Sequence, residues 1–163
     1  MADFDAAIRA AGGRAYQMIG RRRALIQRWR EVYAVRLHVA TGDWTRCGYD
    51  WHSFSDGCTP AQRGIVGWMT YERETVPARV IVCPHERLPA IEIVGAARLP
   101  DFRAHGLNLM VWPDGLAWTM AFTHQDGRGG PYFCRREWAG LRVPGLAQRL
   151  QDPPDQGLGQ VKP

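Results

Sequence analysis

The chain has 163 residues, of which 45% are hydrophobic and 23% are charged, and its formal net charge is +5. These values are ordinary for one globular domain with its own core. No apolar run approaches the roughly 20 residues of a membrane span, and the N-terminus lacks the basic and apolar regions of a signal peptide. We therefore expect a cytoplasmic protein with no membrane partner, whose four cysteines stay reduced.

The positive charge is concentrated near the N-terminus. Residues 1–40 contain eight arginines and only three acidic residues, so this basic helical segment carries the whole charge excess. We predict a short helix over 3–11 and a longer helix over about 14–39, because apolar residues such as Leu25 and Trp29 recur there at helical spacing. Arginines border this apolar stripe, as expected for a helix packed on its own sheet. A nucleic-acid surface and a docking face for an acidic protein are the alternatives.

Shorter elements follow in the middle of the chain. Residues 51–54 resemble a short strand, and Thr59-Pro60 has the form of a helix start, which predicts a helix that ends at about residue 74. Apolar runs predict strands over 76–83 and 90–94, and a short helix or turn over 99–105.

The clearest element is an antiparallel hairpin. An apolar run over 107–112 and an alternating run over 116–123 flank the turn-forming triplet Pro113-Asp114-Gly115. The alternation predicts a half-buried strand with Trp118 in the core, and we expect the glycine to take the left-handed conformation. The chain then re-enters the fold at 131–134.

The order of these elements predicts the fold class. Helices come first, and the strands that follow are separated mostly by turns, which favours an α+β fold with N-terminal helices packed on a mostly antiparallel sheet of about five strands. We expect a single domain over residues 1–150 with a last short helix at 144–150. Residues 151–163 are rich in proline, glycine and glutamine and are predicted to be a disordered tail.

Several short motifs resemble those of a small bacterial family of uncharacterised proteins, a domain of unknown function. The resemblance spans about residues 28–138, and residues 29–33 are similar to the helix that opens the family pattern. An acidic residue follows the histidine in that pattern, whereas this chain has Gln125. The resemblance implies a compact bacterial α+β domain and supplies no activity, ligand or catalytic residue. The motifs that carry it are Trp51-His52-Ser53-Phe54-Ser55, Trp118-Thr119, Phe122-Thr123-His124 and Gly130-Pro131-Tyr132-Phe133.

Two histidines are the candidate catalytic residues. His52 and His124 each lie beside aromatic residues at the edge of a predicted strand. If those strands are neighbours, both imidazoles could share a cleft with Tyr132 and Asp126 and perform acid–base chemistry. No nucleophile pattern accompanies them, which favours two structural histidines. The candidate binding residues are Trp51, His52, His124, Tyr132 and, in the glycine-rich loop, Arg128.

No metal site or cofactor is expected. Cys83-Pro84-His85 is a single Cys-x-His pair, whereas zinc sites bring two closely spaced pairs. The loop over residues 127–130 lacks the lysine of a phosphate-binding loop.

These patterns favour a non-catalytic protein-interaction domain of the immunity or regulator type, by analogy with other small bacterial domains. One alternative is a small enzyme that uses His52 and His124 as an acid–base pair. The other is a weak nucleic-acid binder that uses the arginine-rich helix. A closed polar cleft joining the histidines would favour the enzyme, and an open, aromatic-rimmed surface would favour binding.

Overall fold

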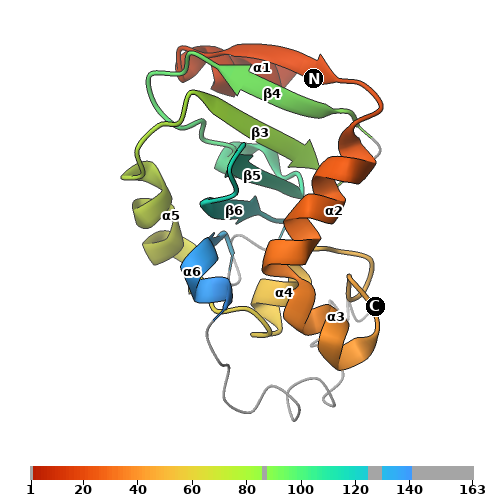
Figure 1. The fold of residues 1–163 in the computed structure, drawn as a ribbon. Coiled ribbons are helices and arrows are strands. Elements are labelled where there is room, and N and C mark those ends of the chain that lie inside the picture. The colour runs from red at the N-terminus through yellow and green to blue at the C-terminus, as the bar shows by residue number, and fades with distance from the viewer. Residues whose placement is uncertain (1, 86–87, 125–129, 141–163) are drawn as a thin grey trace, which may run out of the picture.

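The computed structural model describes residues 2–85, 88–124 and 130–140, which form an α+β fold around one antiparallel sheet (Figure 1). The order of the strands is β1-β4-β3-β5-β6-β7-β2. The fold class is as predicted, but the sheet has seven strands rather than about five. The strands are β1 (Arg14–Met18), β2 (Gln62–Arg63), β3 (Arg79–Pro84), β4 (Ala90–Val94), β5 (Leu109–Pro113), β6 (Trp118–Phe122) and β7 (Tyr132–Arg135). The helices are α1 (Ala2–Ala10), α2 (Arg22–Tyr33), α3 (Val35–Thr41), α4 (His52–Ser55), α5 (Gly64–Glu72) and α6 (Arg136–Ala139), with a 3₁₀ turn at Arg103–His105.

Helices cover both faces of the sheet. In Figure 1, α2 crosses in front of the strands, whereas α1 lies behind β4. Trp29 of α2 belongs to one buried cluster, and Ile8 of α1 and Trp68 of α5 belong to the cluster on the opposite face. Strands β5 and β6 lie between these clusters and are buried at every residue. The prediction of a half-buried strand at β6 was therefore wrong, because Thr119 and Ala121 are also fully covered.

The predicted hairpin is confirmed as β5 and β6, which pair antiparallel through Leu109 and Phe122. Trp118 is in the core, with 4% of its surface exposed. The left-handed residue of the turn is Leu116, with a φ of 54°, and not the expected glycine. Its side chain is buried and its carbonyl accepts a hydrogen bond of 2.8 Å from the hydroxyl of Tyr33, so contacts with α2 hold this unfavourable backbone in place.

The long helix predicted over 14–39 is wrong at its start and is interrupted at residue 34. Residues 14–18 form β1, which pairs with β4 from Arg14 opposite Val94 to Met18 opposite Ala90. Pairing with the sheet overrides local helix preference here, and Gly20, with a φ of 73°, separates the strand from α2. A second break divides α2 from α3 at Ala34. The apolar stripe itself is confirmed, because the buried residues of α2 are Leu25, Ile26, Trp29 and Tyr33.

Two predictions in the middle of the chain are also corrected. Residues 51–54 are not a strand, since His52–Ser55 forms one turn of helix, and three of the four predicted residues are buried without alternation. The helix predicted from Thr59-Pro60 starts only at Gly64, after the short strand β2. Packing explains why residue 67 of α5 is glycine, because an added Cβ would lie 2.7 Å from the carbonyl oxygen of Gln62.

The predicted helix at 144–150 and the predicted tail at 151–163 lie outside the described residues. Within the described ranges, no helix combines the length and the apolar character needed to span a membrane.

Candidate functional site

Three histidines gather at one end of the sheet. The register places Pro84 opposite Leu109, Leu109 opposite Phe122, and Ala121 opposite Tyr132, so these strand ends are adjacent. His85 follows β3 and His124 follows β6, whereas His52 begins α4. His52 and His124 share two neighbours, because both rings contact Tyr49 and Trp51. The two neighbouring strands on which the predicted shared cleft depended are not present, since His52 lies in α4.

Tyr49 is the centre of this cluster. Its ring centroid lies 4.4 Å from that of His85, 5.6 Å from that of His124 and 5.8 Å from that of His52. Neither Tyr49 nor His85 was predicted as a site residue. Both lie in turns between elements, where the sequence has no periodic pattern that would indicate a shared surface.

Asn108 fixes His85 and His124 relative to each other. The backbone carbonyl of Asn108 accepts a hydrogen bond of 2.7 Å from the backbone N–H of His85. Its side-chain Oδ1 accepts hydrogen bonds from the backbone N–H of His124 at 3.1 Å and from Nδ1 of the same ring at 2.8 Å. Since Oδ1 can only accept, Nδ1 of His124 carries a proton, and a neutral ring has its lone pair on Nε2. Asn108 was not predicted as a site residue. The sequence signal for it was that Asn108 is a polar residue within the apolar run 107–112.

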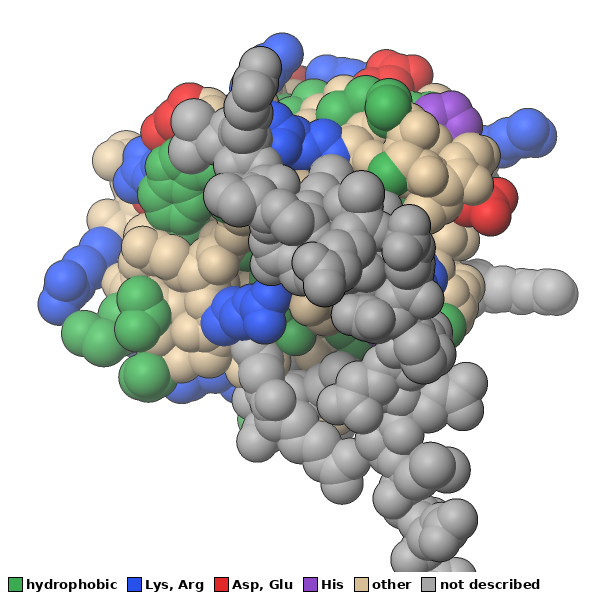
Figure 2. All heavy atoms as spheres, turned by 90° about the horizontal axis from the view of Figure 1, so that it is seen from below, with side chains coloured by type: hydrophobic (Ala, Val, Ile, Leu, Met, Phe, Trp, Pro, Cys, Tyr) green, Lys and Arg blue, Asp and Glu red, His purple; other side chains and the backbone are tan. Residues whose placement is uncertain are grey.

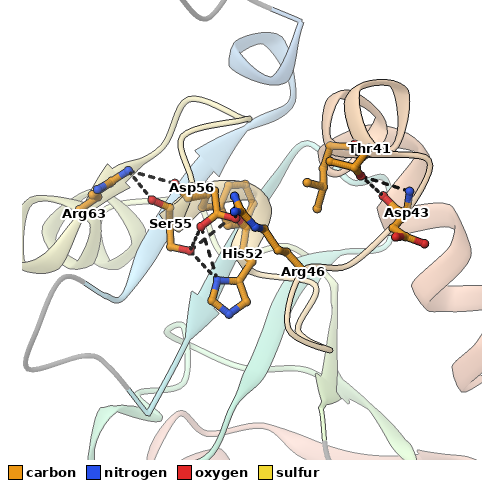
Figure 3. A network of polar contacts seen from close by, with 9 residues as sticks. Thr41, Asp43, Arg46, His52, Ser55, Asp56 and Arg63 are labelled. Atoms are coloured by element: carbon orange, nitrogen blue, oxygen red, sulfur yellow. Dashed lines mark hydrogen bonds and ion pairs between the residues drawn. The ribbon is translucent and has the colours of Figure 1, made fainter. Parts of the chain in front are cut away.

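His52 belongs to a polar network within α4 and the preceding turn (Figure 3). Its Nδ1 lies 2.9 Å from Oγ of Ser55 and 3.7 Å from Oδ1 of Asp56. Asp56 also pairs with Arg46 at 3.3 Å. On the other side of this helical turn, Arg63 donates hydrogen bonds to the carbonyls of Phe54 and Ser55. The network fixes the orientation of the His52 ring.

This network is not a serine–histidine–aspartate triad. A triad places serine at one ring nitrogen of the histidine and aspartate at the other. Here Ser55 and Asp56 both approach Nδ1 of His52. Burial raises the pKa of the nearby Cys83 thiol to about 12, so this cysteine is also not an activated nucleophile.

The other predicted site residues are buried or lie outside the described residues. Trp51 and Tyr132 are only 2% and 3% exposed, and their rings stack at 6.0 Å with an interplanar angle of 16°. Both are therefore interior residues and present no surface to a ligand, and the Trp51 ring also contacts the rings of His52 and His124. Arg128 and Asp126 lie outside the described residues. Neither His52 nor His124 lines the three hollows described below.

Two arginines of α2, the arginine-rich helix, bond to residues in and next to the histidine cluster. Arg30 forms an ion pair of 2.5 Å with the buried carboxylate of Asp50, next to Tyr49. Arg22 donates hydrogen bonds to the carbonyls of Pro84 and His85, at 3.1 and 2.9 Å. These two arginines act within the fold, so they are not a free basic surface.

A second candidate surface was not predicted and lies on α5. Ile65, Val66 and Met69 are 65%, 55% and 41% exposed, whereas Trp68 and Tyr71 of the same helix are buried. Figure 2 shows exposed hydrophobic side chains, with arginines among them, on the side where α5 lies in Figure 1. We call Ile65, Val66 and Met69 the α5 apolar face. The sequence signal for this surface was that α5 is apolar on all sides, so that not every apolar residue can face the sheet.

A hollow of about 180 Å³ borders the α5 apolar face. Its walls include Ile65, Trp68, Arg103 and Pro131. The guanidinium of Arg103 lies 3.7 Å from the centroid of the Trp68 ring, which places a cation at the edge of an apolar surface.

Among the described residues, no group of three histidine, cysteine, aspartate or glutamate side chains is arranged to hold a metal ion. No family model matches this chain, and neither a curated protein nor a solved structure matches it. The resemblance to the small bacterial family therefore stays a prediction.

Proposed function

We propose that this chain is a cytoplasmic, non-catalytic domain that binds another protein through the α5 apolar face. The observation that carries the proposal is the exposure of Ile65, Val66 and Met69 side by side on two turns of one helix. Single exposed apolar residues are common, but a contiguous group with a polar rim marks an interaction surface. A regulator or immunity protein acts through such a surface and needs no catalytic group.

The surroundings of this face indicate the chemistry of the partner. The hollow beside Ile65 is large enough for one apolar side chain, which would serve as the anchor of the interface. The exposed Arg73 follows the C-terminal end of α5. Arg63 precedes the helix and also donates to the carbonyls of Phe54 and Ser55, and Arg103 at the hollow also pairs with Asp101. We expect a partner surface with one protruding apolar residue and acidic residues around it, because opposite charges at the rim speed association and select partners.

The test is site-specific photo-crosslinking in cells of the natural host. A photoreactive amino acid replaces Val66 on the α5 apolar face or, as a control, the exposed Ala24 on α2. We expect a discrete adduct from position 66 and none from position 24. The adduct should disappear when Ile65→Gln and Met69→Gln are added, since glutamine preserves the helix and removes the apolar contact. The absence of an adduct at position 66, or equal adducts at both positions, would contradict the proposal.

A small histidine enzyme is the second candidate. It is favoured by the shared packing of His52 and His124 around Tyr49, and by the hydrogen bond that leaves Nε2 of His124 as its basic nitrogen. We expect His52→Ala and His124→Ala to change stability more than any activity. A turnover assay in which both variants are folded and inactive would establish the enzyme instead.

A further inference from the structure

The two edges of the sheet differ in their capacity to accept another strand. At one edge, β2 has only two residues and leads directly into α5. At the other edge, β1 has five residues, four of them exposed, and no described residue pairs with its outer side. β1 lies at the top of Figure 1, with α1 behind it. In an edge strand, every second residue directs its N–H and C=O groups away from the sheet, where they have no strand partner. β1 can therefore pair with an added extended chain.

A groove between β1 and α1 accompanies this open edge. One hollow, of about 170 Å³, is lined by Phe4, Gln17, Leu88 and Ile91, and another, of about 340 Å³, by Ile8, Arg9, Gly13 and Arg14. Both hollows include Asp5 of α1 and Ala15 of β1, so they are adjacent along the strand. Ala15 and Gln17 face α1 because residues two apart in a strand share a face. An added strand could place alternate side chains in this groove.

Two arginines give the lining of this groove a net positive charge. Arg9 and Arg14 are exposed and line the groove, and neither forms an ion pair with another described residue. Asp5 is the one acidic residue that faces these two arginines in the groove lining described above. An occupant with acidic residues therefore complements this edge.

We propose that β1 binds an extended, acidic peptide segment of a protein partner by strand addition. The unpaired main chain of β1 selects an extended backbone, the groove takes alternate apolar side chains, and the arginines select aspartate or glutamate between them. A second copy of the chain fits less well, because pairing β1 with itself would bring two arginine-rich segments together. This site is distinct from the α5 apolar face and does not depend on it.

The test is selection from a displayed library of random decapeptides, followed by affinity measurement with the enriched peptides. We expect peptides in which apolar residues alternate with aspartate or glutamate. The double variant Arg9→Glu/Arg14→Glu should weaken their binding at least tenfold. The control Arg136→Glu changes an exposed arginine on α6, which lies far from β1 in Figure 1, and should change binding less than twofold.

Hydrogen exchange of the bound complex locates the peptide. Protection of the amides of residues 14–18 supports strand addition. Protection of α5 without protection of β1 overturns this inference and leaves the proposed function intact. The inference is also overturned if no peptide is enriched, if the enriched peptides are not acidic, if β1 mediates dimerisation, or if only nucleic acid binds this edge.

Discussion

Trp29 is the main anchor of α2 on the sheet, and its removal is the sharpest test of the fold. The side chain is fully buried, and its ring centroid lies 5.4 Å from that of Tyr33 and 5.7 Å from that of Phe54. Truncation of a buried tryptophan to alanine costs about 3–5 kcal/mol. Since small domains have a total stability of about 5–15 kcal/mol, Trp29→Ala should remove a large share of it.

A hydrogen bond adds a second, separable contribution. Nε1 of Trp29 donates to Oγ1 of Thr119 at 2.9 Å, in the buried layer between α2 and β6. Thr119→Val leaves that N–H buried without a partner, which costs about 1–3 kcal/mol. Trp29→Phe combined with Thr119→Val removes both partners, so the double variant should lose less stability than the sum of the single variants.

Urea unfolding followed by circular dichroism measures these free energies. The control is Arg23→Ala on the exposed side of α2, which should change the free energy of unfolding by no more than about 0.5 kcal/mol. If Trp29→Ala costs no more than Arg23→Ala, α2 does not pack as described. If the effects of Trp29→Phe and Thr119→Val simply add, the hydrogen bond does not couple these two residues. The cycle uses Trp29→Phe so that the test remains valid if Trp29→Ala does not fold.

Four further outcomes are expected. Trp118→Ala should lower the free energy of unfolding by about 3–5 kcal/mol, and an unchanged melting temperature would show that the side chain is exposed. In thiol labelling, the exposed Cys47 should react first, while the buried Cys83 and Cys134 should react only on unfolding. Burial raises the pKa of the Cys83 and Cys134 thiols from 9.0 to about 12. Their contribution to the free energy of unfolding is fully present below pH 9 and is lost as the pH rises towards 12, because the thiols of the unfolded chain ionise first. Binding of DNA or RNA should be weak, independent of sequence and lost as salt approaches physiological strength; tight, salt-resistant binding of one sequence would support a nucleic-acid function instead.

The sequence predicted the elements whose signals are local. The hairpin was found because the Pro113-Asp114-Gly115 turn and the alternation after it are encoded in a few neighbouring residues. The buried side of α2 was found because helical spacing places Leu25 and Trp29 on one side. The burial of both faces of β6 was missed, because it depends on helices that are distant in the sequence.

The elements that were missed depend on pairing between distant segments. Residues 14–18 have no strong strand signal, and they form β1 because β4 lies beside them. The histidine cluster was predicted only in part for the same reason. His52 and His124 were identified from their aromatic neighbours. His85 and Asn108 join His124 through the register of β3, β5 and β6, and Tyr49 joins the histidines through ring contacts made from the turn before α4.

The central claim is that the α5 apolar face serves binding and not folding. The most direct measurement is the affinity of the partner identified from the Val66 adduct, for the chain and for Ile65→Gln/Met69→Gln. Two anchor residues contribute about 2 kcal/mol each, so we predict at least a ~100-fold loss of affinity, with a free energy of unfolding that changes by less than about 1 kcal/mol. Unchanged affinity in the folded variant would contradict the claim.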